Sequence, residues 1–330
     1  MKKIINNPND VVTEMLQGLA KANPNVVYTG EETQTIHRKE KKAGKVGVIS
    51  GGGSGHEPAH AGYVGYGMLD AAVAGNVFAS PDPTRIIEGL QAADSGAGVL
   101  MVIKNYSGDI MNFEAAGEMA ADFYDIQTAS VIVKDDVAVP DSTYSAGRRG
   151  IAGTVFVHKV AGAAAEQGKT LAEVQAAAQK AADNVRTMGM CMENCILPAN
   201  GKPSRVLAAD EMEVGMGIHS EPGITTQKMG TAKEIAEILT SKVLEDLDFS
   251  GSEVAVMING LGGTPLMELY ILNNEVEKIL TEKGIKVYRT FVGNYMTSLE
   301  MAGCSVSLLR LDEELKGYLD YPSKAPAFPV

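Results

Sequence analysis

The sequence predicts an α/β protein of two domains, and three observations support this fold class. Its 330 residues exceed the length at which a single hydrophobic core usually stops growing. With 45% hydrophobic residues, its composition is that of an ordinary globular protein. Short apolar runs alternate with helical patterns, which indicates a mostly parallel sheet covered on both faces. We expect an N-terminal three-layer domain with such a sheet, residues 1–184, and a smaller C-terminal α/β domain, residues 185–330.

The N-terminal half begins with an amphipathic helix, because Val11, Met15, Leu16 and Leu19 recur at helical spacing. Strands are then predicted at 45–50, 98–106 and 129–135, with a helix over 108–123. Two alanine-rich helices follow, over about 149–168 and 171–188. The second helix opens with Thr170 and Glu173, the spacing of a reciprocal capping box.

The C-terminal half repeats the alternation with methionine-rich runs that we interpret as core. Strand-like patterns occupy 188–197, 211–218, 253–262, 286–295 and 305–312, and helices are predicted over 231–247 and 264–284. The tail 321–330 holds three prolines, so we expect it to be extended or to lie on the surface.

Charge and cysteine usage exclude several classes of function. A net charge of −12 argues against nucleic acid or an anionic membrane as a partner. No run is long enough to span a membrane and no apolar signal segment follows the first lysines, so we expect a cytoplasmic protein. Cys191, Cys195 and Cys304 suit reduced thiols. The four-residue step from Cys191 to Cys195 does not match a zinc knuckle, and no metal site is expected.

A glycine-rich segment, VISGGGSGHEPAHAG at 48–62, follows the first buried strand. The carboxyl end of a strand in a parallel sheet is where ligands bind. The spacing fits neither a P-loop nor a dinucleotide fingerprint, which disfavours a nucleotide site. The residues alone leave open whether His56 is functional or structural, and they favour a structural role for His60.

Other polar residues have both a functional and a plain interpretation. Lys104, Asn105, Ser107 and Asp109 crowd the end of the next strand, where Ser107 or Asp109 can simply cap the following helix. Ser80 stands before a proline-rich helix start, and its plain role is also that of an N-terminal cap.

The remaining histidines carry no clear signal of their own. His219 lies in GMGIHSEPG, a pattern typical of an exposed loop, where a lone histidine is more often a surface residue. His37 and His158 are expected to be solvent-exposed or packing residues.

Taken together, these segments resemble the K subunit of the dihydroxyacetone kinases along the whole chain. The resemblance is carried by SGGGSGHEPAHAGYVG, GNVFASP, IKNYSGD, DDVAV, GRRGIAGT, GIHSEPG and NGLGGTPLMELY. It implies a homodimer in which His219, in the C-terminal domain, holds dihydroxyacetone as a hemiaminal. The substrate hydroxyls would be surrounded by residues of the N-terminal domain, which carries the glycine-rich substrate loop: Gly53, Ser80, Lys104, His56 and Asp109. Of these, His56 and Asp109 are the acid–base candidates. Ser220 departs from the glycine that the family commonly has.

The resemblance also implies which partners the reaction needs. In the similar bacterial form no nucleotide binds to this chain. An L subunit carries ADP or ATP with magnesium, transfers the phosphoryl group, and is recharged by an M subunit of the phosphotransferase system from phosphoenolpyruvate. A phosphoenolpyruvate–glycerone phosphotransferase is therefore the expected activity. The alternative is a paralogue that senses dihydroxyacetone and acts as a transcriptional co-activator; a nucleotide-binding oxidoreductase would rest on fold alone.

The covalent bond has an independent physical rationale. Dihydroxyacetone has about six heavy atoms and no charge, so even contacts at the ceiling of roughly 1.5 kcal/mol per atom would distinguish it poorly from glycerol. A neutral imidazole adds only to a carbonyl, so it selects by functional group.

Overall fold

The computed structural model describes residues 2–139, 147–203 and 205–330, which form two compact units. The first unit comprises residues 2–133, 154–182 and 315–330, and the second comprises the described residues of 134–153 and 183–314. The chain thus passes from one unit to the other more than once. The division into domains 1–184 and 185–330 stays a prediction.

The first unit is built on a six-stranded sheet in the order β1-β2-β4-β3-β5-β6. β3 pairs in parallel with β4 and β5, and β5 pairs in parallel with β6, whereas β1 and β2 are antiparallel. The predicted, mostly parallel sheet is confirmed. The strands are β1 (Val26–Tyr28), β2 (Thr35–Arg38), β3 (Gly47–Ser54), β4 (Ala71–Val77), β5 (Val99–Lys104) and β6 (Thr128–Val133).

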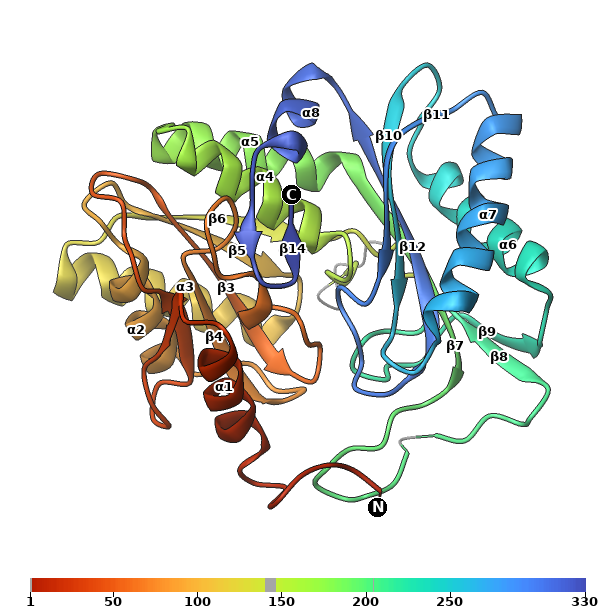
Figure 1. The fold of residues 1–330 in the computed structure, drawn as a ribbon, viewed down its shortest axis with the longest axis horizontal. Coiled ribbons are helices and arrows are strands. Elements are labelled where there is room, and N and C mark those ends of the chain that lie inside the picture. The colour runs from red at the N-terminus through yellow and green to blue at the C-terminus, as the bar shows by residue number, and fades with distance from the viewer. Residues whose placement is uncertain (1, 140–146, 204) are drawn as a thin grey trace. The chain divides into compact units, whose positions relative to one another are not determined.

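Helices cover both faces of this sheet, which makes the predicted three layers (Figure 1). On one face, Ile86 of α2 and Phe113 of α3 pack with Ile49, Val73 and Met101 of the strands. On the other face, α4 contacts β3 and β5 and is buried along its whole length. The helices of this unit are α1 (Val11–Ala22), the 3-10 turn η1 (Ala61–Tyr63), α2 (Pro83–Ala93), α3 (Ser107–Tyr124), α4 (Thr154–Glu166) and α5 (Leu171–Asn184), with α8 (Glu313–Asp320) leading into the strand pair β13 (Lys324–Ala325) and β14 (Phe328–Pro329).

The second unit has a six-stranded sheet in the order β11-β10-β12-β7-β8-β9. β10 and β11 are parallel, and the other pairs are antiparallel. The helices α6 and α7 pack on it, and Met188, Met190, Leu239 and Leu272 are among its core residues. The methionines therefore fill the core, as expected. The elements are β7 (Val185–Glu193), β8 (Glu211–Val214), β9 (Thr225–Lys228), α6 (Ala232–Asp246), β10 (Glu253–Gly260), α7 (Leu266–Glu282), β11 (Lys286–Gly293) and β12 (Ala302–Leu311).

Some predicted boundaries are wrong, for identifiable reasons. The first alanine-rich helix begins and ends inside its predicted range. The second begins where predicted but ends at Asn184, because residues 185–188 pair with β12 as the start of β7. The capping box of Thr170 and Glu173 is present. The tail contains two extended segments, as predicted, but Lys324–Ala325 and Phe328–Pro329 pair with each other and bury Ala325 and Phe328.

Candidate active site

The glycine-rich segment is part of a strand rather than a loop, because β3 continues through Gly51, Gly52 and Gly53. A Cβ on Gly53 would lie 2.6 Å from the backbone nitrogen of Ala79, so no side chain fits there. A Cβ on Gly52 would lie 3.0 Å from Lys104 Nζ and 3.3 Å from Asp109 Oδ2. The glycines therefore let Lys104 and Asp109 come directly against the backbone of β3.

Lys104 and Asp109 form a buried pair of opposite charges. Lys104 ends β5 and is fully buried, Asp109 lies in the first turn of α3 at 2% exposure, and their Nζ and Oδ2 atoms are 3.8 Å apart. The N-cap of α3 is Tyr106, and no side chain donates or accepts a capping hydrogen bond there. The capping role considered for Ser107 and Asp109 is thus wrong. Asp109 Oδ1 has no hydrogen-bond partner among the described residues, so this carboxylate can accept a proton or a hydrogen bond from a ligand.

Ser80 lies beside the same turn of α3. A Cβ on Gly108 would be 2.8 Å from Ser80 Oγ. The cap of α2 is Asp82, whose side chain accepts a hydrogen bond from the backbone of Arg85, so the capping role predicted for Ser80 is wrong. Ser80 Oγ therefore lies next to the first turn of α3, which carries Asp109.

His56 is fully buried and stacks on Phe78, with ring centroids 5.2 Å apart. Phe78 has a φ of 57°, and the position a Cβ on Gly53 would take lies 2.8 Å from Phe78 Cα. Five predicted site residues thus belong to the first unit and lie around the ends of β3 and β5: His56, Gly53, Ser80, Lys104 and Asp109. Their roles in binding and catalysis stay predictions.

Two further histidines lie in the same unit, and the sequence pattern had not singled them out as a pair. His60 Nδ1 is 3.0 Å from Nε2 of His158, which lies on α4. Burial and the nearby charge of Lys104 lower the pKa of His158 to about 3 and that of His60 well below its usual range. Both rings are therefore neutral. No local signal marked His158, since the residue lies 98 positions from His60 on an alanine-rich helix.

His219 belongs to the second unit, in the segment between β8 and β9. Its Nδ1 is 3.1 Å from Glu221 Oε1, and its backbone N–H donates to Glu221 Oε2 at 2.8 Å. The His219 side chain is only 17% exposed, so the expectation of a surface histidine is wrong. The segment turns back on itself, and Ser220 N–H donates to the carbonyl of Gly217.

Glu221 is held as a carboxylate beside this imidazole. Burial alone would raise its pKa, but the hydrogen bond and charge of His219, with a smaller effect of Arg149, outweigh burial and lower the pKa to about 2. Arg149 is itself fixed by Asp136 Oδ2 at 2.7 Å and by the carbonyl of Gly215 at 2.7 Å. When the ring is neutral, a carboxylate on Nδ1 favours the tautomer with the proton there, which leaves Nε2 bare and nucleophilic.

Sequence reasoning had not identified Glu221, Arg149 or Asp136. The signals were present as the glutamate two positions after His219 and as the charged runs DDVAV and GRRG, but their meaning depends on a fold that brings three segments together. Ser220, the departure noted in the sequence, has a φ of 63° and its Oγ is 3.5 Å from Cys195 Sγ.

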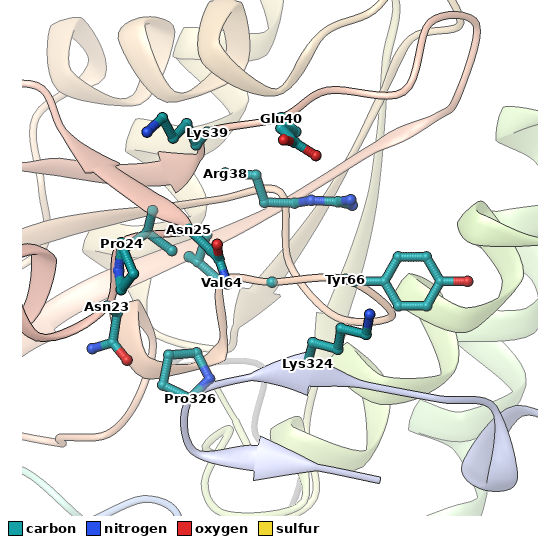
Figure 2. A pocket seen from close by; sticks show the side chains of 12 residues that line it. Asn23, Pro24, Asn25, Arg38, Lys39, Glu40, Val64, Tyr66, Lys324 and Pro326 are labelled. Atoms are coloured by element: carbon teal, nitrogen blue, oxygen red, sulfur yellow. The ribbon is translucent and has the colours of Figure 1, made fainter.

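Three further features of the described residues bear on function: metal-binding groups, membrane spans and a cavity apart from the sites above. Among the described residues, no group of three His, Cys, Asp or Glu side chains could hold a metal ion. No helix in the described ranges is long and apolar enough to cross a membrane. A cavity of about 360 Å³ in the first unit includes Arg38, Tyr66 and Lys324 in its lining and shares no residue with the sites above (Figure 2). Arg38 is already paired with Asp70 and Glu166.

Known proteins resemble this chain over most of its length. Residues 17–327 match the Dak1 domain. The chain is 50% identical over 315 residues, 95% of each chain, to the PTS-dependent dihydroxyacetone kinase 1, dihydroxyacetone-binding subunit DhaK, of Listeria innocua. A structure of the dihydroxyacetone kinase from C. freundii with AMP-PNP and Mg2+ has a TM-score of 0.93 and 35% identity, and the match covers 100% of this chain and 61% of that one. The dihydroxyacetone kinase operon co-activator Dha-DhaQ has a TM-score of 0.91 and 35% identity, covering 96% of this chain and 98% of that chain.

Proposed function

The chain belongs to the Dak1 domain family, and on that premise we propose that it is the dihydroxyacetone-binding subunit of a phosphoenolpyruvate-dependent dihydroxyacetone kinase. It is classed with the kinases, that is, with the phosphotransferases that act on an alcohol. The observation that carries the proposal is the pairing of His219 Nδ1 with the Glu221 carboxylate, because it prepares Nε2 to attack a carbonyl.

The first step is the capture of the ketone by His219. Nε2 forms a bond to the carbonyl carbon, the C=O π bond breaks, and the oxygen gains a proton while the ring gives up the proton on Nδ1. Glu221 stabilises the positive charge that develops on the ring during this addition, since its lowered pKa keeps it ionised. Glycerol has no carbonyl and is excluded by chemistry.

The second step is phosphoryl transfer to a hydroxyl of the captured substrate. Asp109 accepts the hydroxyl proton as the oxygen attacks the phosphoryl group, and Lys104, Ser80, His56 and the backbone of Gly53 bind the substrate oxygens. The buried Lys104–Asp109 pair supports these roles, because it places a hydrogen-bond donor and a carboxylate acceptor 3.8 Å apart at one site. The phosphoryl group would come from ATP held with magnesium on an L subunit, the bond to the β-phosphate oxygen would break, and the ADP left on the L subunit would be rephosphorylated by an M subunit from phosphoenolpyruvate. This chain acts as a cytoplasmic homodimer.

A dihydroxyacetone sensor that acts as a co-activator is the second candidate, and the likeness to Dha-DhaQ favours it. Such a sensor needs the covalent histidine but no base. The presence of Asp109 beside Lys104 therefore favours the kinase.

The test is a reconstituted transfer reaction. The purified chain is mixed with competent L and M subunits, phosphoenolpyruvate and dihydroxyacetone, and dihydroxyacetone phosphate is measured. We expect product with the wild-type chain and with His37→Ala, and none with His219→Ala. Retention of dihydroxyacetone without product would indicate the sensor, whereas a His219→Ala variant that still retains the ligand by intact mass would remove the covalent step.

A further inference from the structure

The two buried histidines of the first unit, His60 and His158, have no part in the function proposed above. Nδ1 of His60 is 3.0 Å from Nε2 of His158, and both side chains are buried. A hydrogen bond between two imidazoles requires one of the two nitrogens to be protonated and the other to be bare. The neighbouring groups determine which of these two nitrogens carries the proton.

Ser50 supplies the deciding contact. Its Oγ donates its single proton to the carbonyl of Val102 at 2.7 Å, so toward His60 Nδ1, 3.4 Å away, it can only accept. These contacts are satisfied together when His60 carries its proton on Nδ1, directed at Ser50 Oγ and His158 Nε2. His158 then has its proton on Nδ1, and Nε2 of His60 is bare.

The pair is also held neutral by its surroundings. The titratable and charged groups near it are Lys104 at the end of β5, His56 and Glu57 after β3, and Tyr63 of η1, whose ring centroid is 6.1 Å from that of His158. A proton added to either ring would place a second positive charge near the Lys104 ammonium in the protein interior. Burial and that like charge both oppose it.

The position of the pair connects it to the lysine. Ser50 and Gly52 are two residues apart on β3 and therefore face the same side of the sheet. Ser50 contacts His60, while the position that a Cβ on Gly52 would take lies 3.0 Å from Lys104 Nζ. Gly52 and His60 also line one small cavity of about 10 Å³, roughly the space of a single water molecule. The imidazole pair and the ammonium group thus adjoin the same stretch of strand.

We propose that His60 and His158 are positioning residues for Lys104, a neutral pair fixed in one tautomer that keeps the bare Nε2 of His60 as an acceptor on the ammonium side of the site. The inference rests on the proposed function, in which Lys104 binds a substrate oxygen. The pair would hold the ammonium in place through one water molecule in the small cavity that Gly52 and His60 line, and it would not itself touch the substrate.

The tautomer is tested on the isolated protein by a measurement that does not depend on its enzymatic activity. ¹⁵N-labelled histidine spectra distinguish protonated from bare ring nitrogens, and His60→Gln and His158→Gln assign the signals. We expect both rings to be neutral with Nδ1 protonated between about pH 6 and about pH 8. A bare Nδ1 on His60, or a doubly protonated ring in this range, would overturn the proposal.

The positioning role is tested with two variants that differ in one acceptor. His158→Gln can offer an amide oxygen near the place of Nε2, whereas His158→Leu cannot. In the transfer reaction we expect KM for dihydroxyacetone to rise about tenfold to about a hundredfold in His158→Leu, with substantial rescue in His158→Gln and no change in the control His37→Gln. Equal KM values for the leucine and glutamine variants would overturn the role.

This design distinguishes failure of the positioning proposal from failure of the proposed function. Thermal melting shows whether each variant folds, and the spectra of the wild-type chain decide the tautomer even if His158→Leu does not fold. If the wild-type chain transfers no phosphoryl group, the proposed function fails while the tautomer result stands. In that case calorimetric binding of dihydroxyacetone to the same variants replaces KM, and equal affinities overturn the positioning role.

Discussion

The carboxylate of Glu221 binds His219 twice, through Nδ1 of the ring at 3.1 Å and through the backbone N–H at 2.8 Å. One side chain therefore fixes both the ring and the main chain of the residue that we propose as the nucleophile. Arg149 in turn holds the loop through Asp136 and the carbonyl of Gly215.

Glu221→Gln should weaken covalent capture of dihydroxyacetone. The amide keeps an acceptor but loses the negative charge that stabilises the ring during addition. We expect the affinity to fall about tenfold to about a hundredfold, by analogy with the loss seen when the hydrogen-bond partner of a metal-binding histidine is removed. Isothermal calorimetry measures it, with the exposed Glu282→Gln on α7 as the control. An unchanged affinity would show that Glu221 does not support the addition.

Acid should destabilise the second unit through the same carboxylate. The pKa of Glu221 is about 2 in the folded protein, below its ordinary value of 4.5. Its contribution to the free energy of unfolding is therefore complete above about 4.5 and is lost as the pH falls through about 2. Urea unfolding at a series of pH values should show a shallower acid dependence in Glu221→Gln than in the wild type. Parallel curves would contradict the pairing.

Asp109→Asn should separate binding from transfer. The amide cannot accept the hydroxyl proton, so the transfer rate should fall about 10²-fold to 10⁴-fold. Binding of dihydroxyacetone by calorimetry should persist, because the covalent bond forms on His219. Asp82→Asn, at the cap of α2, is the matched control and should leave transfer unchanged. Equal transfer rates in the two variants would exclude Asp109 as the base.

Gly52→Ala should disturb both the strand and the site. Its φ of 150° is unusual for a residue with a side chain, and the new Cβ would press on Lys104 and Asp109. We expect a loss of about 1–3 kcal/mol in the free energy of unfolding, together with reduced transfer. Gly18→Ala on α1 meets no atom within 4 Å and should instead gain about 0.5–1 kcal/mol. Chemical denaturation compares the two, and a Gly52→Ala variant as stable as the wild type would refute the packing argument.

Ser220→Gly should stabilise the His219 loop. Ser220 has a φ of 63°, in the left-handed region that glycine adopts without strain. We expect the free energy of unfolding to rise by up to about 1 kcal/mol. Chemical denaturation measures this change, and Ser252→Gly, outside the loop, controls for the added flexibility of glycine. A loss of stability in Ser220→Gly would show that the hydroxyl contact with Cys195 matters more than the backbone.

Much of the architecture could be predicted because periodicity is a local property. The strand that ends at Lys104 and the helix that starts after it follow from an apolar run and a polar break, and so does the placing of Asp109 in the first helical turn. The strand through Gly51–Gly53 could not be predicted, because glycine has a low strand propensity and only the tight packing against residues 78 and 79 explains it.

The missed site residues have a common cause. Glu221 could not be identified from the sequence, because its importance depends on the loop conformation that brings the His219 ring to its carboxylate. His158 could not be identified because only the fold brings its helix next to His60. Charge pairs and histidine pairs form between segments that no spacing rule connects. The caps predicted for Ser80 and Ser107 were wrong for the opposite reason: their neighbourhood fitted a local rule, but Asp82 and Tyr106 occupy those positions.

The burial of all three cysteines has a practical consequence for spectroscopy. Cys191, Cys195 and Cys304 are free and buried, and burial raises the pKa of the Cys191 and Cys304 thiols to about 12. Thiolates are the species that react with maleimide dyes, so these native thiols should label slowly. A single cysteine placed on an exposed helix would then accept a fluorophore selectively, without prior removal of the natural ones.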